Sequence, residues 1–143
     1  DGLMALFGAP VTHENDPERA VRAALEMQTS LQSTREQVRQ KHDLDFQARI
    51  GINTGLVIAG QVGGDLHMEY TVIGDTVNMA DRLQAAAAPG TILVSFPTYQ
   101  RTRPLFEFES LPPMLVKGKP LPIRAFKPVG LLAKTGAMSG LPG

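Results

Sequence analysis

Two polar residues, Asn78 and Arg82, lie four positions apart in the segment 70–83, whose pattern predicts a strand that passes through Gly74 into a helix. On a helix this spacing places the two side chains on one face, with Cβ atoms about 5–6 Å apart. An amide beside a guanidinium can bind a sugar oxygen and a phosphate together, because arginine presents a planar fork of N–H donors. The same spacing is also typical of an ordinary solvated polar face, so the pair alone leaves both interpretations open.

The pair shares a face only if residues 75–88 form a helix, and the apolar residues of this segment predict one. Asp75 or Thr76 is expected to cap its N-terminus, and Pro89-Gly90 to end it. Four residues at helical spacing mark a buried face that points away from the polar pair: Val77, Ala80, Leu83 and Ala87.

The rest of the chain predicts irregularly alternating strands and helices. A long helix is expected over 17–41, with Asp16 as its N-cap and an apolar face formed by Ala20, Ala24, Met27, Leu31 and Val38. A hairpin broken at Asn53-Thr54-Gly55 is expected within 46–61. Further strands are expected at 3–7, 68–73, 91–95, 106–109, 114–116 and 123–126, with a short turn or helix at 97–101. This order predicts an α+β domain with a mixed or antiparallel sheet and helices on one or more of its faces.

Composition narrows the class of protein. A chain of 143 residues with 43% hydrophobic residues is sufficient for one domain with one core. Fourteen basic and fourteen acidic residues give a formal net charge of +0, which argues against nucleic acid or a lipid surface as partner. The chain contains no cysteine and no apolar run of the ~20 residues that a membrane span needs. These features predict a cytoplasmic protein, and the start at Asp1 rather than methionine is typical of a fragment.

The segment GDTVNMADRL, residues 74–83, resembles the signature of class III adenylyl and guanylyl cyclase catalytic domains. Three other parts of the chain resemble this family in the same order. Residues 1–8 (DGLMALFG) resemble the strand and turn around its second metal-binding aspartate. Residues 49–55 and 60–63 resemble its central hairpin, and Val116-Lys117-Gly118 resembles the segment with its late phosphate-contacting lysine. The resemblance implies an α+β, ferredoxin-like nucleotide cyclase fold, with a central, mostly antiparallel sheet flanked by helices. It places the catalytic domain, incomplete at its N-terminus, at 1–128 and a linker at 129–143.

The chemistry that this resemblance implies is adenylate cyclase activity, in which the 3′-hydroxyl of ATP attacks its own α-phosphorus to form cyclic AMP and release pyrophosphate. Two divalent cations, Mg²⁺ or Mn²⁺, are needed, and Asp1 matches one of the two aspartates that bind them. Arg82 would stabilise the charge that develops on the α-phosphate, and Asn78 would orient the ribose. Lys117 would bind the β- and γ-phosphates.

Thr71 matches a position where many members of the family carry an aspartate that recognises the adenine amino group. A threonine hydroxyl can accept the same hydrogen bond. Such sequences resemble the subclass that includes bacterial and soluble bicarbonate-responsive adenylyl cyclases. Thr71 is equally a residue that suits any strand, so both interpretations stay open.

In this family the active site forms between two domains, one with the metal-binding aspartates and one with the asparagine and arginine. Because the chain carries Asp1 together with Asn78 and Arg82, the resemblance implies a head-to-tail homodimer that binds ATP and acts in intracellular signal transduction. The tail resembles a linker that leads to a C-terminal ATPase and helical-repeat regulatory region. The first metal aspartate and an adenine-recognising lysine are expected upstream, so we expect the 143-residue chain alone to be inactive.

Three other functions remain as alternatives. A guanylate cyclase would share the fold and the Asn78–Arg82 pair. An inactive cyclase homology domain would only dimerise and regulate a partner, although a pure binding module need not keep a transition-state arginine. A diguanylate cyclase or polymerase palm shares the use of metals but lacks the TVN-xxx-R helix.

Overall fold

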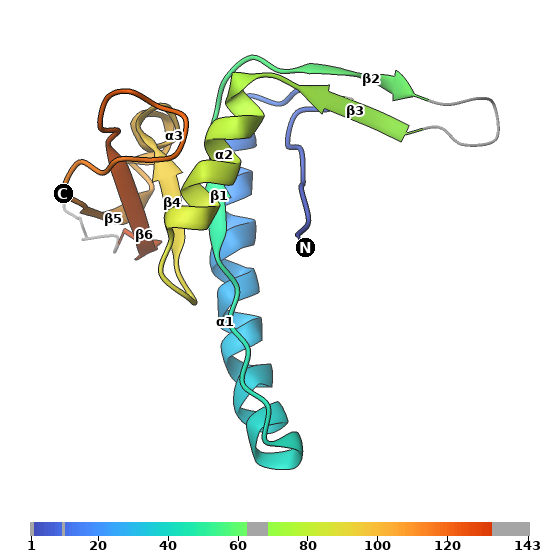
Figure 1. Ribbon diagram of the computed structural model, residues 1–143, viewed down its shortest axis with the longest axis vertical. Coiled ribbons are helices and arrows are strands. Elements are labelled where there is room, and N and C mark those ends of the chain that lie inside the picture. The colour runs from blue at the N-terminus through green and yellow to red at the C-terminus, as the bar shows by residue number, and fades with distance from the viewer. Residues whose placement is uncertain (1, 10, 63–68, 133–143) are drawn as a thin grey trace, which may run out of the picture.

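The computed structural model describes residues 2–9, 11–62 and 69–132, and it confirms the α+β class. The elements, in chain order, are α1 (Asp16–His42), β1 (Ile50–Ile52), β2 (Ile58–Val62), β3 (Glu69–Ile73), α2 (Asp75–Ala86), β4 (Ile92–Ser95), α3 (Phe96–Thr102), β5 (Phe106–Ser110) and β6 (Ala125–Leu131). Four strands form one sheet in the order β1-β4-β6-β5, in which only the β1–β4 pair is parallel. β2 and β3 form a separate antiparallel ribbon that extends away from this sheet (Figure 1).

The sheet is covered on both faces, as the alternation of side chains along β4 requires. Ile92 and Val94 belong to a core cluster with Val21 and Ala24 of α1 and with phenylalanines of β5 and β6. Leu93, between them, points to the other face and packs in a second cluster. That cluster also contains Leu83 of α2, Ala87 at the C-terminal end of α2, and Ala125 of β6. The helix that carries Asn78 and Arg82 is therefore anchored on the face of the sheet opposite α1.

Helix α1 has nearly the predicted bounds, but Asp16 is its first residue and not its N-cap. Asn15 occupies the cap position without a side-chain capping hydrogen bond. The buried Asp16 carboxylate instead accepts hydrogen bonds from the backbone N–H of His13 and from Arg19, both at 2.8 Å. The hydrogen bond from His13 is the main cause of the lowered pKa of Asp16. Met27, which was predicted to lie on the apolar face, is 52% exposed, and Val21 is buried in the core instead.

The hairpin predicted within 46–61 is wrong. β1 pairs in parallel with β4, through Ile50 and Ile92, and β2 pairs with β3. The side chains of the predicted turn bond elsewhere: Asn53 donates to the backbone carbonyl of Thr76 at 3.0 Å, and the hydroxyls of Thr54 and Thr98 share a hydrogen bond of 2.7 Å. These bonds tie the segment after β1 to α2 and α3, so the chain leaves the sheet there and does not fold back.

The strand predicted at 3–7 is also absent, since residues 2–6 have no regular secondary structure and Leu3 is fully exposed. No described strand lies beside this segment to supply backbone hydrogen bonds. Near the C-terminus, the strand predicted at 114–116 is reduced to a single bridge between Met114 and Ile123. β6 continues to Leu131, beyond the predicted domain boundary at 128, and the predicted linker from 133 onward lies outside the described residues.

In the part of the chain that the structure describes, every helix is too short or too polar to cross a membrane.

Candidate active site

Helix α2 begins directly after β3, at a position that only glycine adopts easily. Gly74 is the N-cap, with φ of 143° and no side-chain capping hydrogen bond, so the predicted capping by Asp75 or Thr76 is wrong. The Thr76 hydroxyl donates to the carbonyl of Leu56 at 2.6 Å, and Asp75 turns toward another loop. The turn at Gly74 therefore leaves both side chains available to fix α2 against its surroundings.

The polar pair lies on α2 where the sequence predicted it. Leu83 is completely buried beneath the helix, whereas Asn78 is exposed and the Arg82 side chain is 25% exposed. The predicted apolar face is confirmed at Leu83 and Ala87, which are buried, whereas Val77 and Ala80 are only partly buried.

Residues 116–119, called here the 116–119 loop, pack against the polar face of α2. Val116 is buried, and the Lys119 backbone N–H returns to the Val116 carbonyl at 3.2 Å to close the turn. Gly118 has φ of 85°, and a Cβ atom built on it would lie 2.6 Å from Nη2 and 3.0 Å from Cζ of Arg82. The backbone of the loop is therefore in direct contact with the guanidinium.

An ion pair joins the loop to the start of α2. Nζ of Lys119 donates to both carboxylate oxygens of Asp75, at 2.9 and 3.0 Å. The hydrogen bond and charge of Lys119 lower the pKa of Asp75, and the charge of Arg82 adds a smaller effect in the same direction. Asp75 is consequently a carboxylate at neutral pH, and the attachment of the loop would weaken only as the pH falls through that lowered pKa.

Arg82 is close to Asp75 without a hydrogen bond to it. Its Nη1 lies 3.8 Å from Oδ1 of Asp75, beyond hydrogen-bonding distance, and this nitrogen is buried without a hydrogen-bond partner among the described residues. A buried N–H donor without an acceptor lowers the stability of the folded state, because it has lost its hydrogen bonds to water. Because Nη1 is buried, an oxygen of an anionic ligand would supply the missing acceptor only after the guanidinium turns outward.

The structure brings three of the five predicted site residues to one region. Lys117 is exposed and lies next to Gly118, which contacts Arg82, while Asn78 lies one turn away on α2. Thr71 is in β3, where it pairs with Gly60 of β2, and Asp1 lies outside the described residues. Within the described ranges, no group of three or more His, Cys, Asp or Glu residues could hold a metal ion.

Sequence reasoning missed the Asp75–Lys119 pair. Asp75 was assigned to helix capping, and Lys119 was given no role. The available signal was the pattern Lys117-Gly118-Lys119, in which a glycine between two lysines allows the sharp turn that points them in different directions.

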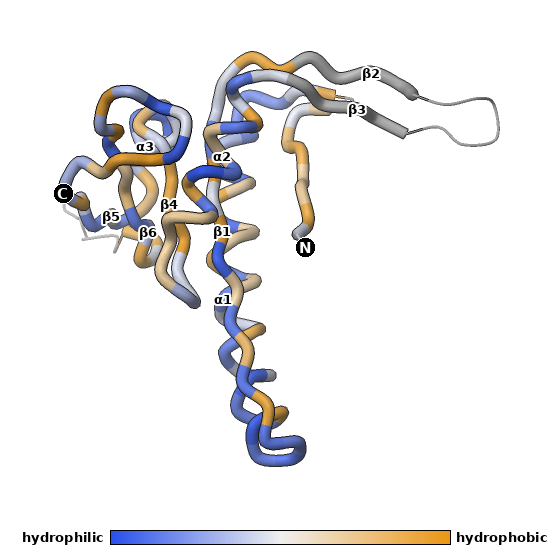
Figure 2. The backbone as a smooth tube through the Cα atoms, in the orientation of Figure 1, coloured by the Kyte–Doolittle hydropathy of each residue, from blue (hydrophilic) through white to orange (hydrophobic). Residues whose placement is uncertain are grey.

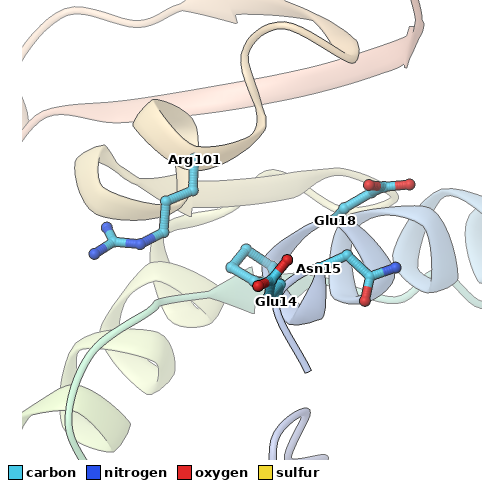
Figure 3. A pocket seen from close by; sticks show the side chains of 5 residues that line it. Glu14, Asn15, Glu18 and Arg101 are labelled. Carbon is cyan, nitrogen blue, oxygen red and sulfur yellow. The ribbon is translucent and has the colours of Figure 1, made fainter. Parts of the chain in front are cut away.

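A hollow of about 310 Å³ lies elsewhere, between the start of α1 and α3. Figure 3 shows Arg101 on one side and Glu14, Asn15 and Glu18 on the other. Two carboxylates beside a single guanidinium do not suit a polyphosphate. None of its lining residues comes from α2 or the 116–119 loop, so the site on α2 is the better candidate.

Comparison with known proteins identifies the domain. Residues 1–129 match the family model described as the adenylate and guanylate cyclase catalytic domain. The chain belongs to this family. The cyclase domain is 31% identical over 134 residues to adenylate cyclase 1 of Rhizobium meliloti (strain 1021), covering 92% of this chain and 20% of that protein. It is 35% identical over 118 residues to soluble guanylate cyclase 89Da of Drosophila melanogaster, covering 81% of this chain and 16% of that protein.

Solved structures agree with the cyclase fold. The adenylyl cyclase CyaB from P. aeruginosa is 33% identical with a TM-score of 0.78, over 86% of this chain and 64% of that one. The guanylate cyclase domain of RhGC from Catenaria anguillulae, solved in complex with GTP, is 30% identical with a TM-score of 0.74, over 88% of this chain and 66% of that one. Because relatives of both kinds match, the family alone leaves open whether the domain uses ATP or GTP.

The contact between Gly118 and Arg82 predicts a specific loss in the variant Gly118→Ala. The positive φ should cost about 1–2 kcal/mol of stability, and the new methyl group should displace the guanidinium and lower kcat. Gly90→Ala is the matched control, because Gly90 has φ of 80° and its Cβ would meet only the flexible end of Gln47. In the complete parent protein, urea denaturation should show similar destabilisation of both variants, and cyclase assays should show a lower kcat only for Gly118→Ala. Equal kcat values would contradict a role for this contact.

Proposed function

We propose that this cyclase domain converts ATP to 3′,5′-cyclic AMP and pyrophosphate, as part of intracellular signal transduction. The observation that supports cyclisation of a nucleoside triphosphate is that the 116–119 loop packs against the partly exposed guanidinium of Arg82 and so places the exposed Lys117 beside the polar face of α2. Cationic donors of this kind are suited to the oxygens of a triphosphate. The choice of ATP rests on the resemblance at Thr71.

The proposed roles follow from charge and reach. Arg82 stabilises the negative charge that grows on the α-phosphate. Asn78, exposed one turn earlier on α2, orients the ribose. Lys117 is exposed and extends toward the β- and γ-phosphates, since Lys119 is the lysine of this loop that binds Asp75.

Cyclase catalytic domains generally depend on divalent metal ions. We propose two such ions, Mg²⁺ or Mn²⁺, with Asp1 as one of their ligands. When bound, the ions would neutralise triphosphate charge and acidify the attacking hydroxyl. The fit of Asp1 to this role rests on the resemblance of residues 1–8, since Asp1 lies outside the described residues.

We further propose that the site is shared by two copies of the chain in a head-to-tail homodimer. The guanylyl cyclase domain of RhoGC from Blastocladiella emersonii has been solved as a non-canonical dimer and as a monomer, so these neighbours do not decide the arrangement of the subunits. A cytoplasmic location and a linker after β6 that leads toward an ATPase and helical-repeat region are parts of the same proposal. The predicted boundary at 128 is moved to the end of β6, at Leu131.

The purine preference is tested by Thr71→Ala in the complete parent protein. Loss of one neutral hydrogen bond, about 0.5–1.5 kcal/mol, should raise the KM for ATP by about 2- to 10-fold and reduce the preference for ATP over GTP. Initial rates of cyclic AMP and cyclic GMP formation measure both effects. Thr29→Ala, which removes an exposed hydroxyl from α1, is the control.

Guanylate cyclase activity is the second candidate, supported by the guanylate cyclase relatives and the GTP-bound structure. A wild-type protein that makes cyclic GMP faster than cyclic AMP would replace the first proposal by this one. A complete parent protein that makes neither product with either metal would support the inactive homology domain instead.

A further inference from the structure

The closest acidic neighbour of Arg82 in the described structure is a residue of its own helix. Asp75 lies seven residues earlier on α2, two turns away on the same face. Its carboxylate is 71% exposed, and one oxygen is already within 3.8 Å of Nη1 of Arg82. A small movement would therefore produce an arginine–carboxylate hydrogen-bonded pair, one of the strongest polar interactions between side chains.

Lys119 competes with Arg82 for the Asp75 carboxylate. Both oxygens of Asp75 are bound to Nζ of Lys119, whose side chain is only 24% exposed and so is held in place by its surroundings. Nη1 of Arg82 has no hydrogen-bond partner among the described residues, although a carboxylate lies 3.8 Å away. Lys119 thus holds the Asp75 carboxylate at this distance from Arg82; each oxygen can still accept a second hydrogen bond, so the competition is one of position and charge.

We propose that Lys119 is a positioning residue that withholds the Asp75 carboxylate from Arg82 and so keeps the guanidinium available for the substrate phosphate. This role rests on the proposed function for its consequence in catalysis. It differs from a role in which the Asp75–Lys119 pair merely fastens the 116–119 loop to α2. The two roles predict opposite results when both residues are changed.

The test uses three variants of the complete parent protein: Lys119→Met, Asp75→Asn and the double variant. Without Lys119, Asp75 should capture Arg82, and kcat should fall by about 10- to 100-fold with a smaller change in KM, because the arginine acts mainly on the transition state. Asp75→Asn removes the competing charge and should cost about 3-fold or less. The double variant should recover to the level of Asp75→Asn, so that the second substitution rescues the first.

Two controls accompany these variants. Lys119→Arg, which can still bind both oxygens of Asp75, should keep most of the activity. Lys41→Met removes an exposed lysine from the end of α1 and should change neither kcat nor KM. Far-UV circular dichroism and thermal midpoints establish that each variant is folded; should Lys119→Met not fold, Lys119→Gln takes its place.

If the pair is only a fastening, either single variant and the double variant will lose activity equally, and the proposal is overturned. A crystal structure of the Lys119→Met parent domain gives a readout that does not depend on activity. We expect an Nη1–Oδ separation of about 2.8–3.0 Å between Arg82 and Asp75, and an unchanged separation contradicts the proposal. A wild-type protein without cyclase activity would defeat the proposed function, while this distance would still decide the positioning role.

Discussion

Replacing Gly51 by alanine is expected to destabilise the domain by about 3 kcal/mol or more, the upper range for overpacking in a core. A Cβ atom on Gly51 would overlap the Ala80 carbonyl oxygen and the Gln84 backbone nitrogen. Both atoms belong to the backbone of α2, so no side chain can rotate to make room. The helix would have to move away from β1, which would also displace Asn78 and Arg82.

Urea denaturation of the parent domain measures the loss of unfolding free energy. Gly130→Ala is the matched control, because Gly130 also lies in a strand of the same sheet and a Cβ there meets no atom within 4 Å. The unfolding free energy of the control should remain within about 1 kcal/mol of the wild-type value. Its new methyl group contacts nothing, and glycine and alanine differ by only about that much in a strand. A Gly51→Ala variant as stable as the Gly130→Ala variant would mean that α2 does not approach β1 this closely.

The helices were predictable because their signals are local. The periodic apolar residues of α1 and α2 located both helices to within one or two residues of their observed bounds at most ends. The caps were not predictable from residue type, because both aspartates have other partners: Asp16 accepts hydrogen bonds from His13 and Arg19, and Asp75 binds Lys119, 44 residues along the chain. At α2, an ion pair with a residue far along the chain therefore outweighs the local preference of aspartate for the capping position.

Strand pairing depends on contacts between distant segments, and there the sequence was less informative. Asn53-Thr54-Gly55 has the residues of a turn, yet its side chains bond to Thr76 and Thr98. β1 then pairs with β4, whose residues lie about 40 positions later. Figure 2 shows that the hydrophobic residues of β1 and β4 lie side by side in space, a relation that periodicity within either segment does not contain.

The residues proposed for catalysis came from resemblance, and their arrangement came from the structure. Spacing alone could not separate a functional Asn78–Arg82 pair from a solvated polar face. The 116–119 loop changes this, because it covers part of Arg82 and leaves one donor without a partner in the described residues. None of these contacts involves Asp1, which lies outside the described residues. Its proposed role as a metal ligand therefore needs a separate test.

Subunit mixing provides that test. In the complete parent protein, Asp1→Ala and Arg82→Ala should each reduce cyclase activity by at least about 10²- to 10³-fold, the loss typical when a group that stabilises the transition state is removed. If Asp1 of one chain works with Asn78 and Arg82 of the other, a mixed dimer of the two variants has one intact site and one doubly damaged site. Free exchange makes about half of the dimers mixed, so roughly a quarter of the wild-type activity should return.

The control is a mixture of Asn78→Ala with Arg82→Ala. Both substitutions damage the same half of the site, so every site in a mixed dimer keeps one defect and activity should not return. Differently tagged subunits, purified together, verify that exchange has occurred. If exchanged Asp1→Ala and Arg82→Ala subunits remain as inactive as either parent, the two halves of the site do not come from different chains. The head-to-tail homodimer would then be wrong, even if each residue is essential.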